Sequence, residues 1–262
     1  MSRISERFTE LKEKNRTALI PFFVPGVPAG VSIENMVLHL EEAGADLIEI
    51  GVPFSAPVAD GPVIQRADEA ALADGMNLDT VLNAVANVRS KTATPLLLLI
   101  YFNTVHHYGC DRFANACRDA GVDGLIVPDL PYEEDAELSE PLQGMPVDLI
   151  TLASMTSRDR LPMILHDSRG FVYCVSTKGV TGERGQLSDG LSGFLAEVRD
   201  ITSTPRAVGF GISTPEQVRS LAPHCEGIII GSGLVRRLLD EGLSEGMNFV
   251  RTLRKALDIS CK

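Results

Sequence analysis

Eight short apolar runs recur along the chain, and they restrict its possible folds more than any other feature. Each run is hydrophobic almost throughout, without the polar–apolar alternation of a sheet that has one face in water. Strands of this kind belong to parallel sheets that are covered on both faces. The runs span residues 18–24, 46–51, 95–101, 124–131, 147–154, 170–177, 206–213 and 226–233.

Helical patterns occupy the gaps between the apolar runs. One begins at Ser32, a residue type that caps helix N-termini, and ends at Gly44, a type that ends helices. A second pattern ends at Gly121. A third begins at Thr214, with Pro215 at the first helical position, where proline is well tolerated. The chain therefore alternates strand and helix from its first apolar run to its last.

This alternation predicts the fold class, a single-domain α/β protein of the (β/α)8 TIM-barrel type that spans residues 1–262. Eight strand–helix units fit a chain of this length. A doubly wound sheet rarely needs eight parallel strands at this length, and no GxGxxG motif follows the first strand. We expect extra helices at the N-terminus and at residues 242–257, and an insertion between Ile50 and Pro95.

Charge and cysteine content exclude several classes of partner. The chain carries 24 Lys and Arg against 35 Asp and Glu, a net charge of −11, so we expect neither nucleic acid nor an anionic membrane as a partner. The five cysteines form no CxxC pair, which is typical of a reduced, cytoplasmic protein. We expect no signal peptide, no membrane helix and no metal site, since His106 and His107 are adjacent and the other histidines are isolated.

Two carboxylates are the candidate catalytic residues. Glu49 lies near the end of the second apolar run, where TIM barrels place their active sites. A carboxyl group buried there either stays protonated or needs a partner, and a raised pKa suits a general acid–base. Asp60 follows in the turn-forming stretch "VADGP". The alternatives are a structural carboxylate at Glu49 and an Asp60 that bonds its own turn.

Glycine-rich segments follow the last two strands. They read "GFGIS" at residues 209–213 and "GSG" at residues 231–233. Loops after strands 7 and 8 form the usual phosphate site of this fold, and Ser213 and Ser232 can add hydroxyl donors. The alternative is two tight turns without a ligand.

The polar segment "STKGVTGERGQLSDG", residues 176–190, follows the sixth strand. Its glycines and its position predict a mobile lid, which Thr181 could fasten to a carboxylate. The alternative is a disordered linker.

Together these motifs resemble the tryptophan synthase alpha subunit family. The resemblance covers nearly the whole chain and rests on "IEIGVPFSAPVADGPVIQ" at Ile48, "YFN" at Tyr101, "GVDGLIVPDLPYEE" at Gly121, "GVTG" at Gly179 and "GFGIS" at Gly209. It implies a barrel that cleaves indole-3-glycerol phosphate to indole and glyceraldehyde 3-phosphate. It also implies a beta subunit partner, in an alpha2beta2 complex, that holds pyridoxal phosphate and joins the indole to serine. No cofactor is expected in this chain.

The resemblance also implies roles for individual residues. Glu49 would carry out the proton transfers, and Asp60 would accept a hydrogen bond from the indole N–H. Thr181 would latch the lid near Asp60. The indole pocket would be walled by Phe22, Leu99, Tyr101, Leu125, Leu152 and Tyr173. The phosphate would be held by Gly182, Phe210, Gly211, Ser213, Gly231 and Ser232.

The sequence departs from the family pattern at three positions. Ala56 stands where relatives carry an acid, Val27 where they often carry aspartate, and Met155 where proline is usual. The first two lie in loops that face the beta subunit in the family. The altered Ala56 and Val27 keep a stand-alone indole-3-glycerol phosphate lyase open as an alternative. Two further alternatives are a non-catalytic regulatory subunit and a related barrel such as a phosphoribosylanthranilate isomerase.

Overall fold

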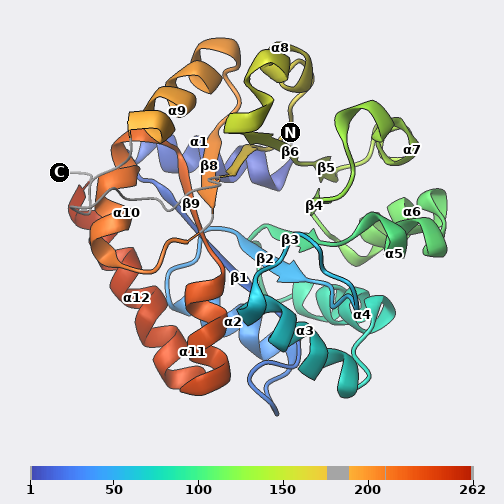
Figure 1. The fold of residues 1–262 in the computed structure, drawn as a ribbon. Helices are drawn as coiled ribbons and strands as arrows, with labels where there is room; N and C mark the ends of the chain where they lie inside the picture. The colour runs from blue at the N-terminus through green and yellow to red at the C-terminus, as the bar shows by residue number, and fades with distance from the viewer. Residues whose placement is uncertain (1, 176–188, 210, 261–262) are drawn as a thin grey trace.

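A computed structural model describes residues 2–175, 189–209 and 211–260 (Figure 1). Its strands are all parallel and lie in the order β5-β4-β3-β2-β1-β9-β8-β7-β6, and all eight predicted strands are present. The strands are β1 Ala18–Phe23, β2 Ile48–Gly51, β3 Leu96–Leu99, β4 Gly124–Ile126, β5 Asp148–Leu149, β6 Thr151–Ser154, β7 Val172–Val175, β8 Arg206–Gly209 and β9 Gly227–Ile230.

The fifth predicted strand closes the barrel. It is divided at Ile150 into β5, which pairs with β4, and β6, which pairs with β7. Because the two halves are continuous in the chain, the two ends of the sheet meet in this one segment. The nine strands therefore form the eight-stranded parallel barrel that the sequence predicts.

Helices surround the strands (Figure 1). Both α3 and α4 lie between β2 and β3, so the predicted insertion is present. The α-helices are α1 Arg3–Glu13, α2 Ile33–Glu42, α3 Pro62–Ala73, α4 Leu78–Arg89, α5 Phe102–Tyr108, α6 Cys110–Ala120, α7 Ala136–Ser139, α8 Leu161–Ile164, α9 Asp189–Ile201, α10 Pro215–Leu221, α11 Ser232–Asp240 and α12 Leu243–Ser260. Short 3-10 turns lie at η1 Tyr132–Glu134, η2 Met155–Arg160 and η3 Ala222–His224.

The predicted helix ends follow from local chemistry. The Ser32 hydroxyl accepts the N–H of Asn35 at the start of α2. Thr214 and Gln217 form a reciprocal capping box at the start of α10. Gly121 ends α6 at a φ of +79°, a left-handed conformation that glycine adopts without strain.

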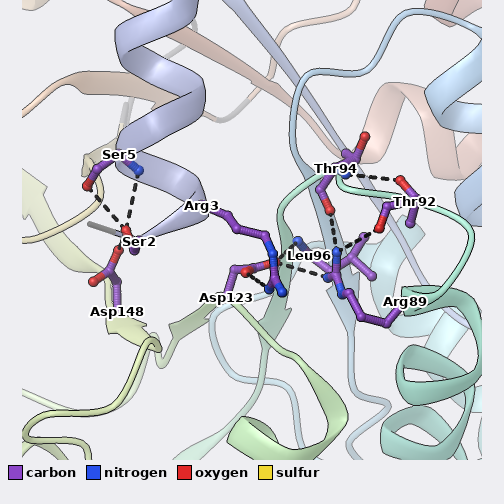
Figure 2. Close-up of polar contacts among 9 residues, drawn as sticks. All are labelled: Ser2, Arg3, Ser5, Arg89, Thr92, Thr94, Leu96, Asp123 and Asp148. Carbon is purple, nitrogen blue, oxygen red and sulfur yellow. Dashed lines mark hydrogen bonds and ion pairs between the residues drawn. The ribbon is translucent and has the colours of Figure 1, made fainter.

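Helix α1 closes the amino-terminal end of the barrel. Its residues Ile4, Phe8 and Leu11 pack into the apolar cluster that fills the barrel interior. Polar contacts hold the surrounding segments (Figure 2). Asp123 accepts hydrogen bonds from Arg3 and from the Leu96 N–H, at 2.6 and 2.8 Å. The amino-terminal end is thus sealed, which leaves the other end for a site.

No helix in the described part of the chain is long and apolar enough to cross a membrane.

Candidate active site

Glu49 lies inside the barrel near the carboxyl ends of the strands. It points to the same side as Leu47, which directly precedes β2 and belongs to the interior cluster. Its side chain is 0% exposed, and neither carboxyl oxygen has a hydrogen-bond partner among the described residues. This burial raises the pKa of Glu49 to about 8. At neutral pH the residue can therefore both give and take a proton.

Asp60 is held at the mouth of the barrel by its side chain and by its backbone. The Tyr101 hydroxyl donates to Oδ2 of Asp60 at 2.6 Å and accepts the Ala59 N–H at 3.0 Å. The Gln65 amide donates to the Asp60 carbonyl at 2.8 Å. Burial raises the pKa of Asp60, while the hydrogen bond from Tyr101 acts in the opposite direction. Tyr101 is itself fixed, because its ring stacks on Phe54 with centroids 4.9 Å apart.

Aromatic rings fill the space that glycines leave in the barrel wall. A methyl group on Gly51 would lie 2.6 Å from the ring of Phe22, which also lies beside Gly231. A methyl group on Gly209 would lie 2.4 Å from the hydroxyl oxygen of Tyr173. Further residues at the edge of the interior cluster are Leu99, Leu152 and Val175. Leu99, Leu152 and Tyr173 therefore lie at the interior cluster. Phe22 lies against Gly51 and beside Gly231. The role of these four residues as a pocket wall stays a prediction.

Leu125 does not face the barrel interior, so its prediction as a pocket residue is wrong on geometry. It pairs with Leu98 and packs in the outer cluster, between the strands and the helices. Its neighbour Ile126 belongs to the interior cluster instead. Successive side chains of a strand point to opposite faces, so an error of one residue exchanges the inside for the outside.

The two glycine loops touch each other. Gly233, in the first turn of α11, lies so close to the loop after β8 that a methyl group there would be 3.2 Å from the Ile212 carbonyl and 3.4 Å from Ser213. Ser232 begins α11, so its N–H and that of Gly233 have no partner within the helix. The Ser213 N–H donates to the Gln217 side chain at 2.7 Å, and the Ser213 hydroxyl, which is the predicted donor to the phosphate, lies 3.4 Å from the same oxygen.

Several predicted residues lie outside the described part of the chain. They are Thr181, Gly182 and Phe210, together with residues 176–188 of the predicted lid. Their predicted roles stay predictions. Gly211 is described, at a φ of +74° that favours glycine.

One of the buried acids that were not identified from the sequence follows the Asp60 loop. Asp68 lies on the buried face of α3 with Ile64, Ala67 and Ala71. Burial and the nearby Asp60 raise the pKa of Asp68 to about 7. An aspartate at helical spacing within an apolar stripe is the only signal that could have identified it. Among the described residues, no group of three or more His, Cys, Asp or Glu side chains could hold a metal ion.

The fold and the buried acid define a class of protein, the TIM-barrel enzymes with acid–base groups at the carboxyl ends of the strands. The family described as Tryptophan synthase alpha chain matches residues 8–257. The tryptophan synthase alpha chain of Alkaliphilus metalliredigens is 45% identical over 245 residues, which are 94% of this chain and 92% of the relative. That of Geobacter sp. (strain M21) is 47% identical over 237 residues, 90% and 89% of the two chains.

Solved structures are similar over almost the full length. Tryptophan synthase subunit alpha from Legionella pneumophila matches with a TM-score of 0.90, at 33% identity over 99% of both chains. A chain of tryptophan synthase from M. tuberculosis, in its aminoacrylate-bound form, matches with a TM-score of 0.84, at 33% identity over 100% of both chains. The chain belongs to the tryptophan synthase alpha chain family, the lyases that cleave indole-3-glycerol phosphate in tryptophan biosynthesis.

Proposed function

We propose that Glu49 performs the proton transfers of indole-3-glycerol phosphate cleavage in this chain. The observation that carries the proposal is a fully buried carboxyl group, without a partner among the described residues, inside the barrel near the strand ends. Burial raises the pKa of Glu49 to about 8, so the acid form predominates at neutral pH and the base form remains accessible.

The reaction exchanges one proton between two atoms of the substrate. Glu49 gives a proton to indole C3, and the glycerol hydroxyl on the adjacent carbon gives one up. The electron pair of the O–H bond forms the second bond of the carbonyl group of glyceraldehyde 3-phosphate as the carbon–carbon bond breaks. The electrons of that bond return to the ring, which restores indole. Glu49 takes up the hydroxyl proton and is ready for another cycle.

Asp60 stabilises the positive charge that protonation creates in the indole ring. It accepts the indole N–H and needs to be ionised to do so. The 2.6 Å hydrogen bond from Tyr101 supports this, because a donor stabilises the ionised carboxylate. Because this carboxylate is already held in position, no group needs to reorient when the positive charge develops in the ring.

The substrate phosphate lies between the two glycine loops in this proposal. The start of α11 offers the N–H groups of Ser232 and Gly233, and a helix N-terminus favours anions. The contact between Gly233 and Ser213 supports one joint site rather than two separate turns. The further predicted phosphate residues are Gly182, Phe210, Gly211 and Gly231.

We also propose that the chain acts with a beta subunit that holds pyridoxal phosphate, in an alpha2beta2 complex. Its relatives are named tryptophan synthase alpha chains, which supports a partner of this kind. All 262 residues would form one domain, since α1 fills the barrel end and α12 packs on α10 and α11. Free thiols at Cys110, Cys117, Cys174 and Cys225 support a cytoplasmic location.

The test is indole release by Glu49→Gln, with and without a beta subunit. We expect cleavage to fall by about 10²–10⁴-fold while substrate binding, measured by calorimetry, persists. Glu13→Gln is the matched control, because Glu13 is exposed on α1 at the opposite end of the barrel. A Glu49→Gln variant with more than about a tenth of the original rate would exclude this role, since the loss expected for a proton-transfer group is larger.

A further inference from the structure

Gln65 is a polar residue in the first turns of helix α3 to which the proposed mechanism gives no role. It ends the stretch "ADGPVIQ", which runs from the Asp60 loop into the helix. Its side chain is partly buried, and its amide donates to the Asp60 carbonyl at 2.8 Å. A side chain of α3 thus holds the main chain of the residue that would stabilise the indole ring.

The direction of this hydrogen bond indicates which element it stabilises. The first N–H groups of an α-helix have no partner within the helix, so side chains that stabilise a helix start accept hydrogen bonds from them. Gln65 does the reverse. Its amide donates, and the acceptor carbonyl of Asp60 lies before the helix begins at Pro62. The bond therefore fixes the loop rather than the helix.

Asp60 is held at three of its polar groups, and Gln65 supplies one of these bonds. The Asp60 N–H donates to the Pro57 carbonyl at 3.0 Å, within the same loop. The Tyr101 hydroxyl donates to Oδ2 of Asp60 at 2.6 Å. The other carboxylate oxygen, Oδ1, has no hydrogen bond within the described part of the chain, so it is available for the indole N–H. The bond from Gln65 links this loop to α3.

Helix α3 is a firm anchor for this bond, because its apolar face is buried in the core and the helix packs against α11. Arg66, the residue after Gln65, forms an ion pair with Asp240 of α11. Helix α11 begins at Ser232, in the proposed phosphate site. Gln65 therefore joins Asp60, which would bind the indole end of the substrate, to the two packed helices that include the phosphate end of the site.

We propose that Gln65 is a positioning residue that fixes Asp60 at the distance from the phosphate site that the transition state requires. This inference rests on the proposed role of Asp60. Positive charge develops in the indole ring as C3 is protonated, whereas the bound substrate lacks it. A displaced Asp60 therefore weakens the transition state more than it weakens substrate binding. A displacement of about 1 Å can lower a rate by about 10²-fold, and the loss of one anchor among three should cost less.

The experiment measures indole release by Gln65→Glu and Gln65→Met in the complex with the beta subunit, at about pH 8, where a glutamate is ionised. Both side chains are close to glutamine in size, and neither can donate to a carbonyl at this pH. We expect kcat to fall about five- to twentyfold, with KM within about twofold of wild type. Glu69→Met is the matched control, because Glu69 is exposed on the same helix, and it is expected to keep the wild-type kcat.

A double-mutant cycle with Asp60→Asn tests whether Gln65 acts through Asp60. In the Asp60→Asn background, Gln65→Met is expected to lower kcat by less than about twofold, because the charge that Gln65 positions is already absent. An undiminished loss in that background, a loss that appears in KM instead of kcat, or wild-type kcat in both Gln65 variants would overturn the proposal. If Gln65→Met does not fold, Gln65→Glu decides both measurements. Full activity of Asp60→Asn would refute the proposed function itself, which is a distinguishable result.

Discussion

Glu49 is a residue whose proposed chemistry conflicts with the stability of its own barrel. It is fully buried, and its two carboxyl oxygens have no hydrogen-bond partner among the described residues. Such a group is tolerated as a neutral acid and is costly as an anion. The same burial that makes Glu49 a usable acid–base near neutral pH therefore destabilises the folded chain when the pH rises.

This conflict predicts the pH dependence of stability at residue 49. Burial raises the pKa of Glu49 from an ordinary value of 4.5 to about 8. The folded chain therefore keeps a proton that the unfolded chain releases between those values, so this residue's contribution to the free energy of unfolding falls as pH rises through that window. Glu49→Gln should match wild type near pH 4.5 and exceed it above pH 8 by up to about 5 kcal/mol.

Urea denaturation of both proteins between pH 5 and pH 9 checks this expectation. Glu13→Gln is the control, because Glu13 is exposed on α1 at the opposite end of the barrel. A constant difference between Glu49→Gln and wild type over the whole range would contradict a raised pKa at Glu49.

The site residues show where sequence reasoning stops at this scale. Glu49 and Asp60 could be singled out as candidates because a strand end and a rigid turn both carry acids, and their catalytic roles stay predictions. The inward residue of β4 was not, because Leu125 and Ile126 are both apolar and only the pairing register separates them. Asp68 was missed because a single acid on a helix usually faces water.

At the scale of elements, α1 lies outside the strand–helix repeat and acts as a plug. Its apolar face fills the barrel interior. Arg3, at the start of α1, donates to Asp123, the last residue of the loop that connects α6 to β4. Asp123 is nearly fully buried and also accepts from Arg89 of α4 at 3.0 Å and from the Leu96 N–H of β3. One carboxylate thus joins three elements at the closed end of the barrel (Figure 2).

Arg3 and Arg89 should contribute differently to the free energy of unfolding through their contacts with Asp123. Asp123→Ala leaves the side chain of Arg89, 14% exposed, without its anion, and we expect the free energy of unfolding to fall by about 3–5 kcal/mol. Arg3→Ala removes a side chain that is 45% exposed and should cost at most about 1 kcal/mol. Urea denaturation measures both values. Equal losses in the two variants would show that Asp123 is not the centre of this network.

The elements themselves were largely readable from the chain. Continuous apolar runs and cap residues such as Ser32 and Thr214 define strands and helix starts locally. The division of the fifth strand at Ile150 was not readable, because it depends on which neighbour each half pairs with. Pairing is a property of the closed barrel and leaves no local mark in the sequence.

At the scale of the whole molecule, the loop that carries Asp60 also reaches the surface. Val58, two residues before Asp60, is 85% exposed, and Ala56 is exposed as well. The inner side of the loop is fixed by the Tyr101 hydroxyl, which accepts the Ala59 N–H and donates to Asp60. A partner that binds the outer side of this loop would therefore directly influence the position of Asp60.

Ala56 is the residue at which this coupling can be tested. The family resemblance implies an acid at this position, which could pair with a basic residue of a beta subunit, whereas Ala56 cannot. We expect the complex to form through other surface, with weaker activation of indole release. If the partner retains a base, Ala56→Asp should tighten the complex and increase activation, because an interfacial charge pair contributes from nothing to several kcal/mol.

The outcomes of Ala56→Asp are measured as the affinity of the complex, by calorimetry, and as indole release with and without the beta subunit. Repeating both measurements at high salt concentration separates these outcomes. A gain that comes from a charge pair should shrink in high salt, where the Debye length falls to about 3 Å at 1 M. A partner that has repacked around Ala56 should instead bind the aspartate variant more weakly, because an unpaired charge would be buried. No change in affinity or activation would mean that position 56 does not touch the partner. Within the described part of the chain, the position of Asp60 would then depend on its hydrogen bonds with Tyr101 and Gln65, as in a lyase that releases free indole.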